Sequence, residues 1–108
     1  MASSKEYLEY ILECLSELDE ISARKMMGEY LIYYRSKLVG GIYDDRFLVK
    51  DIPPAKKLLP DAAEELPYEG AKPMLLVDAP EDRELMSRLF DTLYNELPAG
   101  KKRIKKGG

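Results

Sequence analysis

The chain has 108 residues, 45% hydrophobic and 34% charged, which suits a single folded domain with one apolar core and excludes a disordered composition. No apolar stretch approaches the roughly 20 residues that cross a bilayer, and no signal-peptide pattern opens the sequence, so we expect a cytoplasmic protein without a membrane partner. The net charge of −3 combines a body with 12 basic and 20 acidic residues and a basic C-terminal tail. The basic residues of that tail are Lys101, Lys102, Arg103, Lys105 and Lys106.

The first predicted element is a helix over roughly residues 4–18. Ser3 and Glu6 match a capping box, in which each side chain satisfies a free backbone N–H of the first turn. Apolar residues recur at helical spacing after this start, and acidic residues fill the opposite side. The apolar positions are Tyr7, Leu8, Ile11, Leu12, Leu15 and Leu18.

Three strands are predicted next, over Tyr30–Tyr34, Leu38–Tyr43 and Phe47–Val49, because these segments are rich in aromatic and β-branched residues. The segments between them, Arg35-Ser36-Lys37 and Asp44-Asp45-Arg46, are short enough for hairpin loops. We therefore expect an antiparallel meander that the preceding helix covers on one face.

The middle of the chain predicts a short helix and two short strands. Asp51 could cap a helix over Ala55–Leu59, since proline is tolerated in a first helical turn. Strands are expected around Glu65–Tyr68 and Met74–Val77, between prolines and a glycine that break regular structure.

The last element is a helix that begins near Pro80 and reaches Leu97, with acidic residues in its first turn and a broad apolar stripe. The element order is thus α-β-β-β-α-β-β-α, which indicates an α+β fold with a largely antiparallel sheet packed by helices. We expect one domain over residues 1–98, and a disordered basic tail over residues 99–108.

Three sequence blocks carry a resemblance to a known family: MMGEY at 26–30, GGIYDDR at 40–46 and PYEGAKPM at 67–74. They resemble the signature blocks of TfoX/Sxy N-terminal domains, in the same order, and the resemblance spans roughly residues 3–97. It implies a fold similar to type III secretion chaperones and a link to bacterial regulators of competence, which assist transcription alongside a catabolite-type activator. The chain departs from the founding members in having a short basic tail where they have a C-terminal helical domain.

Catalytic chemistry is poorly represented. Histidine is absent, which removes the commonest general base, and Cys14 alone cannot form an internal disulfide or a zinc site. Asp44, Asp45 and Asp51 are the best carboxylate group, but Asp favours turns through local hydrogen bonds. Gly40-Gly41 is typical of a bulge or close packing rather than a phosphate loop. We therefore expect no enzyme activity, no metal and no cofactor.

Tyrosines gather on the predicted strands, and alternation puts Tyr30, Ile32 and Tyr34 on one face with Leu31 and Tyr33 on the other. Such tyrosines serve either core packing or a partner-binding surface, where Tyr is enriched. The segment 67–74 serves either as a structural connection or as a recognition loop. The candidate partner-binding residues are Tyr30, Tyr34, Tyr43, Tyr68, Glu69 and Lys72.

Two functions compete on these grounds. The first is a regulatory or adaptor domain of the TfoX/Sxy type that binds a protein partner, in transcriptional or competence regulation. The alternative is a nucleic-acid accessory protein that makes weak, salt-sensitive contacts through the candidate nucleic-acid tail Lys101, Lys102, Arg103, Lys105 and Lys106. An exposed sheet edge would also allow a homodimer.

Overall fold

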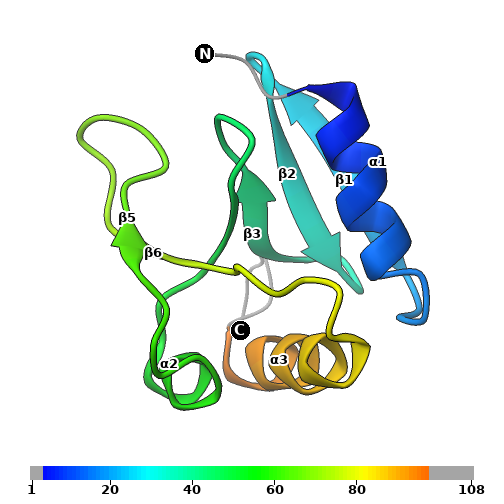
Figure 1. Ribbon diagram of the computed structural model, residues 1–108, viewed down its shortest axis with the longest axis vertical. Coiled ribbons are helices and arrows are strands. Elements are labelled where there is room, and N and C mark those ends of the chain that lie inside the picture. Colours follow the sequence, from blue (N-terminus) through cyan, green and yellow to red (C-terminus); the bar gives the residue numbers. More distant parts are fainter. Residues whose placement is uncertain (1–3, 98–108) are drawn as a thin grey trace, which may run out of the picture.

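Residues 4–97 are described by the computed structural model, and they form one six-stranded antiparallel sheet and three helices (Figure 1). The predicted α+β class is therefore confirmed. The strand order in the sheet is β1-β2-β3-β4-β6-β5. The elements in chain order are α1 Lys5–Cys14, β1 Ile21–Met26, β2 Glu29–Tyr34, β3 Lys37–Ile42, β4 Phe47–Val49, α2 Pro53–Leu58, β5 Glu64–Glu65, β6 Met74–Leu76 and α3 Arg83–Glu96.

Tight turns join β1 to β2, β2 to β3 and β3 to β4. Each turn has two central residues with positive φ, as in the hairpin turns whose twist matches that of the strands: Met27-Gly28, Arg35-Ser36 and Asp44-Asp45. Tyr43 and Arg46 exchange backbone hydrogen bonds of 2.9 and 3.0 Å around the third turn. Asp44 and Asp45 thus form the turn for which their side chains are suited.

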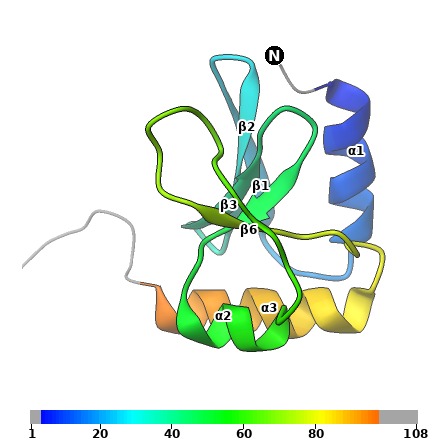
Figure 2. The ribbon, with the colours of Figure 1, turned by 60° about the vertical axis from the view of Figure 1, so that its left-hand side comes forward.

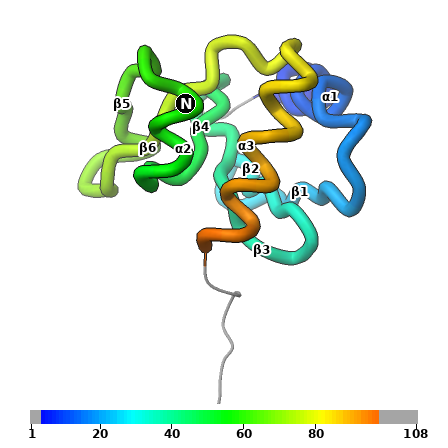
Figure 3. The backbone as a smooth tube through the Cα atoms, turned by 90° about the horizontal axis from the view of Figure 1, so that it is seen from below, coloured from blue at the N-terminus to red at the C-terminus, as the bar shows by residue number. Residues whose placement is uncertain are grey.

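The helices leave one sheet face uncovered. Ile11 and Leu15 from the end of α1, together with the apolar stripe of α3, join one core cluster with the inward side chains of the sheet. Figure 2 shows α2 and α3 side by side beneath the sheet with α1 standing at its flank, and Figure 3 shows α3 between the other two helices. The fully buried sheet residues facing this cluster include Ile32, Val49 and Leu75.

The end of α3 is fixed by a lysine from the sheet. The ammonium group of Lys37 donates to the backbone oxygens of Tyr94 and Leu97 at 2.7 and 2.9 Å, and it lies 4.2 Å from the centre of the Tyr94 ring. A cation at this place satisfies the carbonyls of the last turn and opposes the negative end of the helix dipole. The contact joins β3 to α3 across 57 residues of sequence.

The ends of the two long helices differ from the prediction. Ser4, and not Ser3, caps α1, because the Ser4 hydroxyl accepts the Tyr7 N–H at 3.1 Å. The helix ends at Cys14 instead of residue 18, since Leu18 donates to the Leu15 oxygen in a turn that leads into β1. The helix α3 begins at Arg83 rather than near Pro80, with Asp82 as its cap.

One strand was missed, so the predicted element order is wrong by one strand. The segment Ile21–Met26 pairs with β2 along its whole length, yet five of its six residues are exposed. Because neither face of this edge strand is buried, its sequence lacks the apolar alternation that identifies strands. The remaining meander of β2, β3 and β4 agrees with the prediction.

The middle of the chain brings two further corrections. Ile52 is the cap residue of α2 and makes no side-chain hydrogen bond, so Asp51 does not cap this helix. The strand expected around Glu65–Tyr68 is limited to Glu64–Glu65, because Pro67 has no N–H to continue the pairing. None of the helices within residues 4–97 is long and apolar enough to cross a membrane.

Candidate functional site

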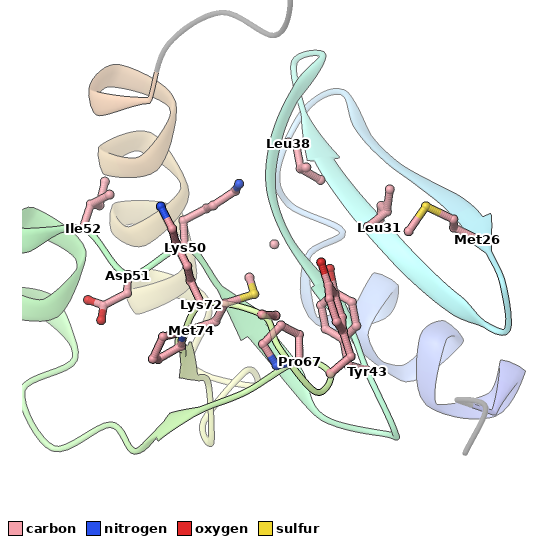
Figure 4. Close-up of a pocket in the computed structure, with 14 residues that line it drawn as sticks. Met26, Leu31, Leu38, Tyr43, Lys50, Asp51, Ile52, Pro67, Lys72 and Met74 are labelled. Carbon is pink, nitrogen blue, oxygen red and sulfur yellow. The ribbon is translucent and has the colours of Figure 1, made fainter.

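The uncovered face of the sheet forms one wall of a groove of about 450 Å³. Alternation along β2 sends Ile32 and Tyr34 into the core and leaves Leu31 on the opposite side. Leu38 of β3 and Met26 of β1 line the groove together with Leu31. In Figure 4 these three apolar side chains lie along the β1–β3 side of the groove. A sheet face that no helix covers thus becomes an apolar surface.

The glycine pair in β3 brings Tyr43 onto this surface. An added Cβ at Gly41 would lie 2.8 Å from the Tyr43 ring and 2.7 Å from the Tyr30 backbone oxygen, so the Tyr43 ring lies directly over Gly41. At Gly40 an added Cβ would overlap the Leu48 backbone oxygen. The register of β2 and β3 shifts between Ile32 and Tyr33, which confirms the bulge expected near these glycines.

The second wall is the segment 66–73, which Arg46 fastens to the sheet. The guanidinium of Arg46 pairs with Glu65 at 2.6 Å and donates to the backbone oxygens of Leu66 and Tyr43 at 3.2 and 3.1 Å. The rings of Tyr43 and Tyr68 meet with centroids 6.3 Å apart. Burial, then the proximity of Tyr68, raises the pKa of the Tyr43 phenol above its ordinary value. The wall is therefore held at a fixed distance from the strands.

Charged side chains collect at one end of the groove. Lys50 follows β4, Lys72 belongs to the segment 66–73, and both line the groove with Asp51 (Figure 4). Asp51 interacts with Glu64, which in turn forms a 2.8 Å ion pair with Lys56. Slight desolvation of this exposed side chain, followed by its hydrogen bond to Glu64, raises the pKa of the Asp51 carboxyl. The side chains of Lys50 and Lys72 have no ion pair or hydrogen bond to any residue between 4 and 97.

Exposed apolar side chains concentrate beside the groove. Five large hydrophobic residues within 4–97 are strongly exposed, and Met26 (44%) and Tyr68 (63%) line the groove itself. Met27 (96%) and Leu66 (48%) are their neighbours in the chain, whereas Tyr10 lies on α1. Two of the five thus line the groove, and two more lie within two residues of them in the sequence.

The structure brings together only part of the predicted partner-binding set. Tyr43, Tyr68 and Lys72 line the groove, and Glu69 is exposed in the same segment without lining it. Tyr34 is 3% exposed and donates its hydroxyl to Asp91 at 3.2 Å, between Phe90 and Tyr94 of α3.

Tyr30 is half-buried and packs against the same core cluster. These two tyrosines therefore serve packing, the alternative left open from the sequence. The basic tail, with Lys101, Lys102, Arg103, Lys105 and Lys106, lies outside the described residues.

Sequence reasoning missed the apolar half of the groove: Leu31, Leu38, Met26 and Met74. Their alternation along the strands was visible, but only the position of the helices decides which sheet face stays open. Met26 belongs to the block MMGEY, and its place next to the Met27-Gly28 turn was the one sequence feature that set it apart. The β4–β6 pairing, which carries segment 66–73 to the sheet, is a long-range contact that no local pattern indicates.

The residues considered for chemistry are spread over the fold. Within residues 4–97 no three acidic or cysteine side chains are placed to hold a metal ion, so Asp44, Asp45 and Asp51 form no such group. Cys14 is buried, with 6% exposure, on the inner side of α1. Within the described residues, these side chains therefore form no common chemical site.

Comparison with known proteins found similarity along nearly the whole chain. A protein of Spirochaeta aurantia, described as an uncharacterized 12.7 kDa protein in the trpE 5' region, is 27% identical to this chain over 107 residues. The likeness covers 98% of this chain and 93% of that protein. No family model and no solved structure matches the chain.

Proposed function

We propose that the chain is a non-enzymatic regulatory or adaptor domain that binds another protein along the groove between β1–β3 and segment 66–73. The observation that carries this proposal is an apolar groove lined by two strongly exposed side chains, Met26 and Tyr68. Tyrosine anchors protein interfaces, and methionine adapts its shape to a partner surface. The groove volume of about 450 Å³ falls within the range of ligand clefts, roughly 300–1,000 Å³.

The fixed geometry of the groove supports binding rather than mere loop packing. Arg46 connects both walls through Glu65, Leu66 and Tyr43, so the partner would meet a preformed surface. A preformed surface loses little conformational entropy on binding. The groove walls also contain parts of all three blocks that resemble TfoX/Sxy domains, which supports a role in transcriptional or competence regulation.

A second candidate function rests on the tail. Five of the 17 basic residues lie in the last eight positions, whereas the rest of the chain has 12 basic and 20 acidic residues. We propose as the alternative that this tail contacts nucleic acid weakly. Its test is fluorescence anisotropy with duplex DNA over a salt series, for the full chain and for a variant with the five tail cations replaced by Gln. Binding that falls steeply with salt and disappears in the variant supports it; equal binding by both proteins contradicts it.

The protein-binding proposal is tested with two exposed tyrosines, Tyr68 in the groove and Tyr10 on α1. The full-length wild type, Tyr68→Ala and the matched control Tyr10→Ala are used to capture partners from an extract of the source organism, and each captured protein is purified for direct titration. A partner that binds wild type and Tyr10→Ala equally but binds Tyr68→Ala about tenfold more weakly supports the proposal, since hot-spot tyrosines contribute at least this much. A partner that does not distinguish Tyr68→Ala from wild type contradicts it.

A further inference from the structure

The charges around the groove differ from those of the rest of the domain. Residues 4–97 include 12 basic and 20 acidic side chains, and six of the basic side chains have a polar or ring partner within that range. The other six have none there: Lys5, Arg24, Lys25, Lys50, Lys57 and Lys72. Lys50 and Lys72 lie in the groove, and Arg24 is the β1 residue two positions before Met26, on the same strand face.

Most acidic side chains near the groove have partners, and exposed Glu69 of segment 66–73 does not line the groove. Glu65 pairs with Arg46, and Glu29 accepts the Asp44 backbone N–H at 3.1 Å. Asp51 is the one carboxylate that lines the groove among the described residues, and it interacts with Glu64. The groove therefore offers ammonium groups at one end and apolar side chains along its length. A partner that complements both must carry a negative charge next to apolar groups.

We propose that the groove binds a peptide segment of a partner protein in which acidic residues alternate with or adjoin large apolar residues. The carboxylate of such a segment pairs with Lys50 and Lys72, while its apolar side chains lie against Leu31, Leu38 and Tyr43. This inference rests on the proposed function and names the chemistry of its partner. An acidic partner segment also explains how a groove with unpaired lysines exists on a domain that is acidic as a whole, because the lysines select for the partner.

The same charges disfavour other occupants. A symmetric pairing of β1 with the β1 of a second copy would bring the Arg24 and Lys25 cations of both copies into one patch, and like charges across strands are destabilising. Nucleic acid requires clustered cations along its phosphates, but a body with 20 acidic residues against 12 basic ones repels it. An acidic, apolar peptide meets neither objection.

The test selects peptides without assuming a sequence. A displayed library of random decapeptides is selected on the immobilised full-length chain, and the enriched peptides are titrated by fluorescence anisotropy. We expect enrichment of Asp or Glu next to Leu, Met or Phe. We also expect affinity to fall about tenfold with K50E/K72E, because two attractions become repulsions, and to change less than about twofold with the control K5E/K57E, which alters the net charge equally.

Two further arms keep the test decisive. Replacing the acidic residues of a selected peptide by Lys should restore its binding to K50E/K72E, a result that misfolding of the variant cannot produce. The milder K50Q/K72Q variant, with its fold checked by circular dichroism, should bind the acidic peptide with an affinity between those of wild type and K50E/K72E. Sodium octanoate and a single-stranded oligonucleotide are titrated in parallel, and sedimentation measures the oligomeric state.

The outcomes separate this inference from the proposed function. Neutral or basic peptides that lose affinity in Tyr68→Ala would overturn the acidic partner and leave the groove as a protein-binding site. Peptides that bind Tyr68→Ala and K50E/K72E as tightly as they bind wild type would overturn both this inference and the proposed function. The absence of any enriched peptide would do the same. Octanoate or the oligonucleotide binding the groove more tightly than every peptide, or a dimer that buries Tyr68, would also overturn the inference.

Discussion

The two faces of the sheet both contain apolar residues, but these residues have different roles. On the covered face, Ile32, Val49 and Leu75 are fully buried beneath α1 and α3, so their apolar surface stabilises the fold. On the open face, Leu31 and Leu38 have no helix above them and line the groove instead. Alternate residues of the same strand thus contribute either to the stability of the fold or to the groove surface. Substitutions on the two faces should therefore affect stability and partner binding separately.

The largest effect is expected from a leucine on the covered face. Leu75→Ala removes a fully buried side chain and should lower the free energy of unfolding by about 3 kcal/mol, because a cavity remains in the core. Leu31→Ala, its counterpart on the open face, should cost about 1 kcal/mol but weaken partner binding. Urea denaturation measures the first property and titration with a captured partner the second. Equal losses of stability would contradict the division between the faces.

A second test concerns the close approach of β3 and β4. Gly40→Ala would force a Cβ against the Leu48 backbone oxygen, which cannot move without separating the strands. We expect a loss of about 2 kcal/mol, as for other overpacked sites. Thermal denaturation followed by circular dichroism measures it, with Ser22→Ala on exposed β1 as the control. A Gly40→Ala variant as stable as wild type would show that the strands are not in close contact.

The third test breaks the link between the sheet and α3. Lys37→Met removes the ammonium group that caps the carbonyls of Tyr94 and Leu97, and we expect a loss of about 1 kcal/mol. Lys57→Met, at a lysine without a partner in the described chain, is the control and should leave stability unchanged. Urea unfolding distinguishes the two. Equal midpoints for both variants would mean that the cap contributes nothing.

The smallest expected effect is a pH dependence at the charged end of the groove. Folding raises the pKa of Asp51, first by slight desolvation and then by its hydrogen bond to Glu64, so its ionisation favours the unfolded chain as the pH rises through the shifted pKa. Folding lowers the pKa of Glu64 through Lys56, so the ionised Glu64 stabilises the fold at neutral pH and this contribution is lost on acidification.

Relative to wild type, Asp51→Asn should therefore gain stability from acidic to neutral pH, and Glu64→Gln should lose it. Urea unfolding at pH 3.5 and pH 7 measures both differences. The same sign of change for the two variants would contradict the assigned interactions.

Most of the fold follows from local sequence signals, while the site depends on contacts between distant segments. The apolar stripes of α1 and α3 and the aromatic strands β2–β4 could be predicted because burial on one side leaves a periodic pattern. The strand β1 could not, since both of its faces are exposed. Tyr68 and Lys72 could be identified as candidates from their unusual segment, but Lys50 and Leu38 join them only through the pairing of β4 with β6.

Photo-cross-linking in living cells tests the central claim, that the open face is the binding surface, most directly. A photoreactive phenylalanine derivative is placed at Tyr68 beside the groove or at Tyr10 on α1, both of which are exposed. We expect a discrete cross-linked partner from position 68, lost when K50E/K72E is added, and none from position 10. A partner cross-linked from position 10 but not from position 68 would contradict the account.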